Sequence, residues 1–199
     1  MEDLSLHLLD IAENSINAGA TKIVIRITED PEKDIYSIMV EDNGPGMKAE
    51  VLLKAEDPFF TSKQDKRFGL GVPLLKQAAL ECGGEFRLES EPGSGTSLFA
   101  SFRYSHIDRK PLGDIGSTML SLICGHPEVR YVLFYELNGG PGNKGGVHYG
   151  FDSGALKEAL GATPVNLPEI LLIVRDSINL AVTPIKDQKK IAAKGHNKR

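Results

Sequence analysis

The sequence contains only two cysteines, and their placement excludes the usual cysteine-rich architectures. Cys82 and Cys124 lie far apart and lack the spacing of metal ligands. Both fall in apolar helical patterns, so we expect two small buried residues and no disulfide. No apolar run approaches the roughly 20 residues that cross a bilayer, and the acidic start Met1-Glu2-Asp3 is unlike a signal peptide. We therefore expect a soluble, cytoplasmic protein with no membrane partner.

The chain also lacks a strong excess of charge of one sign. Its 199 residues include 23 basic and 27 acidic side chains, for a formal charge of -4. This balance gives no reason to expect a nucleic-acid partner. Only residues 186–199 are locally basic, and we interpret them as a solvated tail. Hydrophobic residues make up 41%, enough for a core, and the length suits one large domain or one domain with an extension.

The first hundred residues alternate between helical and strand patterns. Apolar residues at helical spacing follow a capping Asp3 and stop before Gly19. Two β-branched runs, joined by a charged turn at 29–34, predict a hairpin. An amphipathic helix then precedes two more strands. The predicted ranges are helices at 4–17, 48–54 and 70–81, and strands at 23–28, 35–41, 85–90 and 96–102.

Two polar segments in this half have a chemical reason to meet at a nucleotide. Asp10 and Asn14 are four residues apart on a helix, so they point the same way, and an amide oxygen is a hard ligand suited to Mg²⁺. Asp42 ends a strand, where its carboxylate can accept from the amine of adenine but would repel the oxygen that guanine presents there. Asp42 is also the first residue of a loop that continues to Met47.

Glycines supply the rest of the predicted site. In the loop after Asp42, Gly44 and Gly46 let the backbone approach a flat ligand. Before the helix at 70–81, the run Gly69-Leu70-Gly71 leaves backbone N–H groups and a helix dipole for an anion, and Lys63 upstream supplies mobile positive charge. A last tight turn at 93–96 leads through Thr96 into a strand. We therefore expect the four segments to contact the phosphates and the base of one nucleotide.

Each segment also has an ordinary interpretation. The helix face carrying Asp10 and Asn14 could be a solvated surface, the loop after Asp42 a hairpin turn, the run before the helix a flexible loop with an N-cap, and the turn at 93–96 a hairpin. No one of them is specific. Their order and spacing along one chain favour a single nucleotide site.

Together the segments resemble the ATP-binding domain shared by gyrases, chaperones, histidine kinases and mismatch-repair ATPases. Glu13-Asn14-Ser15, followed by residues 18–21, is similar to the asparagine box of mismatch-repair ATPases, whereas residues 42–47 and 69–96 are closer to histidine kinases. Residues 57–63 resemble the phenylalanine box that begins the ATP lid of those kinases. The resemblance covers about 4–102. It implies an α+β fold of the Bergerat type, a two-layer α/β sandwich whose mixed sheet carries helices on one face.

The resemblance also implies roles for the candidate residues. The ligands would be ATP and Mg²⁺, with Asn14 as the metal ligand and Asp42 as the reader of adenine. Asp10 occupies the position where hydrolysing members carry a glutamate base, although its side chain is one methylene shorter. The remaining nucleotide contacts would come from Gly44, Gly46, Met47, Lys63, Gly69, Leu70, Gly71 and Thr96. Glu13 would point elsewhere on the helix.

Sensor kinases place a dimerising two-helix domain with a phosphorylated histidine before this domain. His7 lies on the first helix itself, so the acceptor role is not carried over to it, and we interpret it as a helix-face residue near the site. We expect a stand-alone domain, similar in layout to the small anti-sigma kinases, that needs a partner to supply the acceptor.

The second half resembles no family that its motifs identify. A helix at 114–124, strands at 130–137 and 147–151, a short helix between Asp152 and Gly161, and a helix at 168–182 predict a smaller α/β extension. It either continues the sheet or forms a docking domain. The glycine-rich run 138–146 lacks the spacing of a phosphate loop. We thus divide the chain into an ATP-binding domain at 1–104, an extension at 105–183 and a tail at 184–199.

Two functions follow from these observations. The first is Mg²⁺-dependent transfer of the terminal phosphoryl group of ATP to a His or Ser of an unidentified regulatory protein, as in a histidine-kinase-like or anti-sigma-kinase-like enzyme. The alternative is a slow ATPase or ATP-sensing switch that engages a partner through lid closure. A scaffold that binds no nucleotide is a third. The oligomeric state stays open, with a dimer as one possibility.

Overall fold

One mixed sheet of six strands organises the part of the chain that the computed structural model describes, residues 3–55, 71–139 and 146–182. Its strand order is β3-β4-β2-β1-β5-β6. β1 and β5 are parallel, and every other pair of neighbours is antiparallel. The strands are β1 (Lys22–Asp30), β2 (Ile35–Asp42), β3 (Phe86–Glu91), β4 (Gly95–Arg103), β5 (Arg130–Leu137) and β6 (Val147–Asp152).

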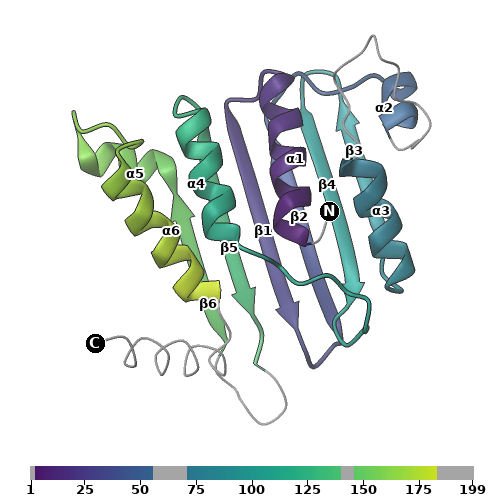
Figure 1. Cartoon of the computed structure of the whole chain (residues 1–199). Helices are drawn as coiled ribbons and strands as arrows, with labels where there is room; N and C mark the ends of the chain where they lie inside the picture. Colours follow the sequence, from purple (N-terminus) through teal and green to yellow (C-terminus); the bar gives the residue numbers. More distant parts are fainter. Residues whose placement is uncertain (1–2, 56–70, 140–145, 183–199) are drawn as a thin grey trace.

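Helices cover one face of this sheet (Figure 1). α1 (Leu4–Asn17) lies between α3 (Gly71–Glu81) and α4 (Ile115–Gly125), and α6 (Pro168–Val182) packs beside α4. Two short helices complete the layer: α2 (Ala49–Ala55), which contacts β3, and α5 (Ser153–Leu160), which contacts β5. The fold is therefore the expected α+β two-layer sandwich.

Alternation along the strands places the core between the two layers. Ile23, Ile25 and Ile27 of β1 are buried beneath the helices, and the register pairs Ile25 with Val40 and Ile27 with Ile38. From the other layer, α1 contributes an apolar stripe that includes fully buried Leu4 and Leu8. Its predicted limits are confirmed, because the Asp3 carboxylate accepts from the amide of Leu6 and Gly19 follows the last turn at a φ of 95°.

The second half of the chain continues the same sheet. β5 pairs with β1 from Lys22↔Arg130 to Glu29↔Leu137, which is nearly the whole length of β1. All five elements predicted after residue 105 are present. Of the two arrangements left open by the sequence, the structure has the continuous one, with α4 and α6 extending the helical layer over β5 and β6 (Figure 1).

Two local predictions were wrong. The charged stretch after residue 28 was expected to be a turn, but β1 continues to Asp30, and both Glu29 and Asp30 are buried because residues distant in sequence hydrogen-bond to them. Cys82 is buried as expected, whereas Cys124 is exposed, since α4 turns its apolar side, including Leu122 and Ile123, toward the core.

Candidate functional site

The end of β2 and the start of β4 bring two predicted site residues together. Asp42 and Thr96 are direct cross-strand partners, and both lie on the side of the sheet that the helices cover. The Asp42 carboxylate accepts from the Ser15 hydroxyl of α1 at 2.6 Å and from the Gly44 amide at 2.8 Å. Each carboxylate oxygen therefore has one bond that fixes it and a remaining lone pair for a further donor.

The loop after Asp42 packs closely on the turn between β3 and β4. Gly46 has a φ of 67°, and a Cβ there would overlap the carbonyl of Glu91. Likewise, a Cβ at Gly95 would overlap the carbonyl of Asp42. These glycines are required by backbone packing whether or not a ligand lies nearby. Contact of Gly44 and Gly46 with a base stays a prediction.

Ser90 is a residue of this site that the sequence did not reveal. Its hydroxyl accepts from the Met47 amide at 2.9 Å, donates to the Gly95 carbonyl at 2.8 Å and lies 3.0 Å from the Thr96 hydroxyl. It therefore ties the loop at residues 42–47 to the start of β4. A serine near a strand end carries no signal of its own, and only the register of β3 and β4 gives it this role.

The polar side of α1 carries the second half of the site. Asp10 and Asn14 are both partly buried, and they lie one turn apart as predicted. Oδ2 of Asp10 and Nδ2 of Asn14 are shielded from solvent and have no hydrogen-bond partner within the described residues. Buried polar atoms in that condition are rare and costly, so each calls for a specific explanation.

Gly71, the first residue of α3, sits directly against Asp10. A Cβ at Gly71 would overlap the Asp10 carboxylate, so only glycine allows the two helices to come this close. The start of α3 and the acidic side chain of α1 thus lie in direct contact. Binding of phosphate groups at this helix start stays a prediction. Lys63, Gly69 and Leu70, together with the predicted phenylalanine box at 57–63, lie outside the described residues.

The side-chain oxygens of Asp10 and Asn14 suit Mg²⁺ that is bound together with a nucleotide. They do not suit a metal ion that protein side chains hold alone. Within the described ranges, no three His, Cys, Asp or Glu side chains cluster closely enough to hold a metal. Mg²⁺ is usually bound by one or two side-chain oxygens together with substrate phosphates. The amide of Asn14 and the carboxylate of Asp10 are hard ligands of that kind. These residues therefore fit a metal that arrives with a nucleotide.

Two further side chains of α1 confirm how the helix is oriented. Glu13 points away from Asp10 and Asn14, as expected, and its carboxylate lies 3.5 Å from the His126 ring at the end of α4. His7, interpreted from the sequence as a helix-face residue, is completely buried. The helix face that carries Asp10 and Asn14 therefore also carries a histidine that is buried in the protein and not exposed to solvent.

Comparison with known protein families matches the part of the chain that contains these residues. The family model for "Histidine kinase-, DNA gyrase B-, and HSP90-like ATPase" matches residues 2–106, from α1 to just beyond β4. The chain belongs to this family. It therefore carries an ATP-binding domain, and the end of the sheet that holds Asp42 lies within the matched residues.

The similar proteins are bacterial kinases and a repair protein. The chain is 41% identical over 69 residues to the sensor kinase CckA of Brucella abortus, covering 34% of this chain and 7% of that protein. It is 34% identical over 88 residues to sporulation kinase C of Bacillus subtilis, covering 44% of this chain and 20% of that kinase. The matches thus span only a small share of these relatives.

A solved structure shares the fold of this family member. The N-terminal domain of a DNA repair protein superposes with a TM-score of 0.50 at 14% identity, over 74% of this chain and 52% of that chain.

In the segments that the structure describes, no helix has both the length and the apolar character needed to cross a bilayer.

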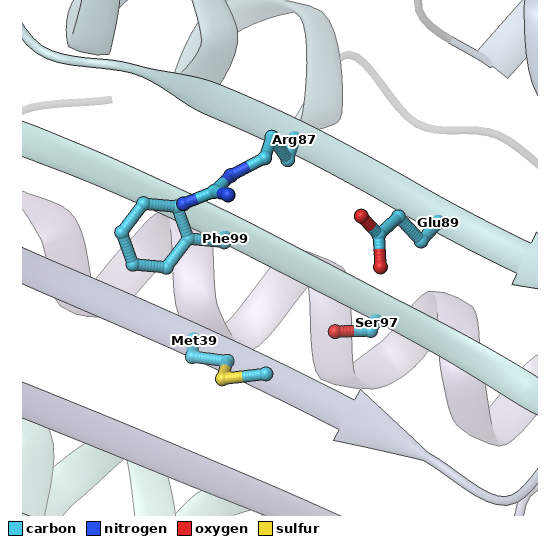
Figure 2. Close-up of a pocket in the computed structure, with 5 residues that line it drawn as sticks. All are labelled: Met39, Arg87, Glu89, Ser97 and Phe99. Atoms are coloured by element: carbon cyan, nitrogen blue, oxygen red, sulfur yellow. The ribbon is translucent and has the colours of Figure 1, made fainter.

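A shallow hollow lies on the face of the sheet that the helices leave bare (Figure 2). Its volume is about 270 Å³, and it is lined by Met39, Arg87, Glu89, Ser97 and Phe99. Because side chains alternate along a strand, Ser97 faces away from its neighbour Thr96. The hollow is therefore on the opposite side of the sheet from the candidate site formed by Asp42 and Thr96.

Proposed function

We propose that this chain binds Mg–ATP between α1, the start of α3 and the end of β2, and transfers the terminal phosphoryl group to a His or Ser of a partner protein. The observation that supports this most directly is the α1 face, where Asp10 and Asn14 present buried polar atoms that no described side chain satisfies. A ligand that supplies a metal and phosphate oxygens would satisfy both. The family membership makes that ligand ATP.

Asn14 would hold the metal through its amide oxygen. When bound, Mg²⁺ would neutralise charge on the phosphates and help align them for displacement. The backbone amides at the start of α3 would contact the phosphate oxygens, because a helix N-terminus favours negative charge. Catalysis of this kind depends mostly on positioning, which suits a site built from a rigid helix pair.

Asp42 would select the base. Ser15 and Gly44 hold its carboxylate in one orientation, so its remaining lone pairs are preorganised to accept from the exocyclic amine of adenine. The Thr96 hydroxyl, aligned by Ser90, would support the same edge of the base. Guanine carries an oxygen where adenine carries the amine, so a charged acceptor at this point disfavours GTP.

Asp10 would act as the base that accepts a proton from the attacking group. Its unpartnered oxygen lies beside Gly71 at the start of α3, and with the phosphates bound at that helix start it would accept a proton from a hydroxyl or a water molecule. The same geometry supports the second candidate, a slow ATPase or ATP-sensing switch in which water is the acceptor. The two functions differ only in what reaches Asp10.

The experiment that separates them uses γ-labelled ATP with the wild-type chain, alone and with lysate of the source cell. Label on a protein supports phosphotransfer, and release of free phosphate alone supports the ATPase. Asp10→Asn should reduce either activity at least tenfold, whereas Glu13→Gln, on the same helix but facing His126, should leave it unchanged. Equal loss in both variants, or none in Asp10→Asn, would contradict the assignment of Asp10.

A further inference from the structure

His7 is the innermost member of the polar face of α1. Its side chain is 0% exposed, and its Nδ1 has no hydrogen-bond partner among the described residues, so its burial calls for an explanation. It lies one turn before Asp10, so His7, Asp10 and Asn14 form a row on one side of the helix. We call this row the α1 polar stripe.

One ring nitrogen of His7 has an evident partner. Lys110 Nζ lies 3.4 Å from Nε2. A lysine ammonium can only donate, so Nε2 accepts and the ring proton resides on Nδ1. The ring is therefore neutral. Burial, reinforced by the Lys110 charge, lowers the pKa of His7 to about 4.

The other ring nitrogen, Nδ1, is enclosed by the protein. It has no hydrogen-bond partner within the described residues. The main chain of Gly71 lies near the ring and raises the pKa of His7, against the larger effects of burial and Lys110. Gly71 is the same residue that contacts the Asp10 carboxylate. His7 and Asp10 thus hold the start of α3 from two successive turns of α1.

The Lys110 end of this arrangement is fixed independently. The carbonyls of Pro111 and Leu112 accept from the amides of Leu4 and Ser5, at 3.0 and 2.8 Å. They satisfy backbone donors that the first turn of a helix otherwise leaves unpaired. The segment that carries Lys110 is therefore attached to α1 beside His7, and it cannot shift without uncapping the helix.

We propose that His7 is a positioning residue of the ATP site: held by Lys110 on one side, it fixes the start of α3 against Asp10 on the other. This inference rests on the proposed function only for its effect on turnover. The contact of the ring with Gly71, and its dependence on Lys110, exist without nucleotide.

The test compares three replacements that keep different parts of the ring. Asn places its amide nitrogen near the position of Nδ1, Gln places its own near Nε2, and Leu keeps neither. We expect His7→Leu and His7→Gln to lower turnover at saturating Mg–ATP about tenfold with less than a threefold change in Mg–ATP affinity, and His7→Asn to stay within threefold of wild type. Lys110→Met should reproduce part of the loss. His148→Leu, on exposed β6, is the matched control.

A second measurement does not require turnover. Hydrogen exchange at the amides of Leu75 and Lys76, whose helical bonds to the carbonyls of Gly71 and Val72 close the first turn of α3, should be about tenfold faster without nucleotide in His7→Leu and Lys110→Met than in wild type and in His148→Leu. Unchanged exchange and turnover in His7→Leu, or a loss in His7→Asn as large as in His7→Leu, would overturn the proposal. If wild type fails to bind Mg–ATP, the proposed function fails, while the exchange result still decides whether His7 positions α3.

Discussion

The two ends of the helix-covered side of the sheet differ in whether their buried polar groups have hydrogen-bond partners. At the end formed by Asp42 and the α1 polar stripe, Asp10 and Asn14 keep buried atoms that nothing in the described structure satisfies. At the other end, Glu29 is equally hidden, but its carboxylate accepts from the Tyr135 hydroxyl at 3.1 Å. A buried polar group that has partners stabilises a fold, whereas one without partners costs stability and calls for a specific explanation, which a bound ligand would give.

The Glu29 end is an internal network. The Arg109 guanidinium lies 4.8 Å from the ring centre of Tyr36 and 5.0 Å from that of Tyr104, and it donates to the Tyr104 carbonyl at 2.9 Å. Its charge partly offsets the burial that raises the pKa of Glu29. The Tyr36 hydroxyl is the one exception among these groups, since no described residue hydrogen-bonds to it. This end connects β1, β5 and the segment after β4.

The largest effect that this comparison predicts is at the Glu29 end. Glu29→Ala would leave the buried Tyr135 hydroxyl without its acceptor and would remove the negative charge that offsets Arg109, so we expect the free energy of unfolding to fall by about 3 to 5 kcal/mol. Urea unfolding followed by circular dichroism measures this, with exposed Glu136→Ala as the control. Affinity for Mg–ATP at 10 °C, where the variant is folded, should be unchanged. A stable variant with weakened ATP binding would reverse the roles given to the two ends.

At the ATP end the expected effect is on binding instead. Asn14→Ala should weaken Mg–ATP binding about 100-fold, equivalent to about 2.7 kcal/mol. Its unfolding free energy should stay the same or rise, because the change removes a buried atom that lacks a partner. Calorimetric titration and thermal unfolding measure the two quantities. Asn17→Ala, at the exposed end of the same helix, is the control, and a comparable loss there would remove the specific role of Asn14.

The smallest effect concerns pH and His7. The folded-state pKa of about 4 lies below the ordinary histidine value of 6.5, so between these values the unfolded chain binds the proton and the folded chain does not. Stability is therefore lost as pH falls from 6.5 toward 4, by about 2 kcal/mol between pH 7.5 and 5. His7→Leu should remove that part of the pH dependence. If the free energies of unfolding of wild type and variant changed with pH in the same way, the prediction would be wrong, and His7 would be accessible to protons in the folded chain.

The sequence predicted local features of the fold well and distant ones poorly. β1, β2 and β4 follow from alternating apolar residues, and the limits of α1 follow from Asp3 and Gly19. The parallel pairing of β5 with β1 joins residues about a hundred positions apart, and no local pattern encodes that register. Glu29 appeared to belong to a turn because its partners, Tyr135 and Arg109, cannot be identified from its neighbours.

The candidate site shows the same limit. Asp10, Asn14, Asp42 and Thr96 were predicted as site residues because their residue types and spacing carry chemistry. The hydrogen bonds of Ser15 and Ser90 and the contact of Gly71 with Asp10 were not predicted. They depend on how the helices pack and on the register of β3 and β4. The burial of His7 is of the same kind, since its partner Lys110 follows β4.

The most direct test of the ATP site is a calorimetric titration of the wild-type chain with Mg–ATP and, in parallel, with Mg–GTP. The structure predicts one site per chain, saturable binding of Mg–ATP, and an affinity for Mg–GTP at least tenfold lower because of the fixed Asp42 carboxylate. Folded protein that gives no heat and no thermal shift with Mg–ATP would contradict the central claim. Equal affinity for both nucleotides would contradict the role of Asp42 alone.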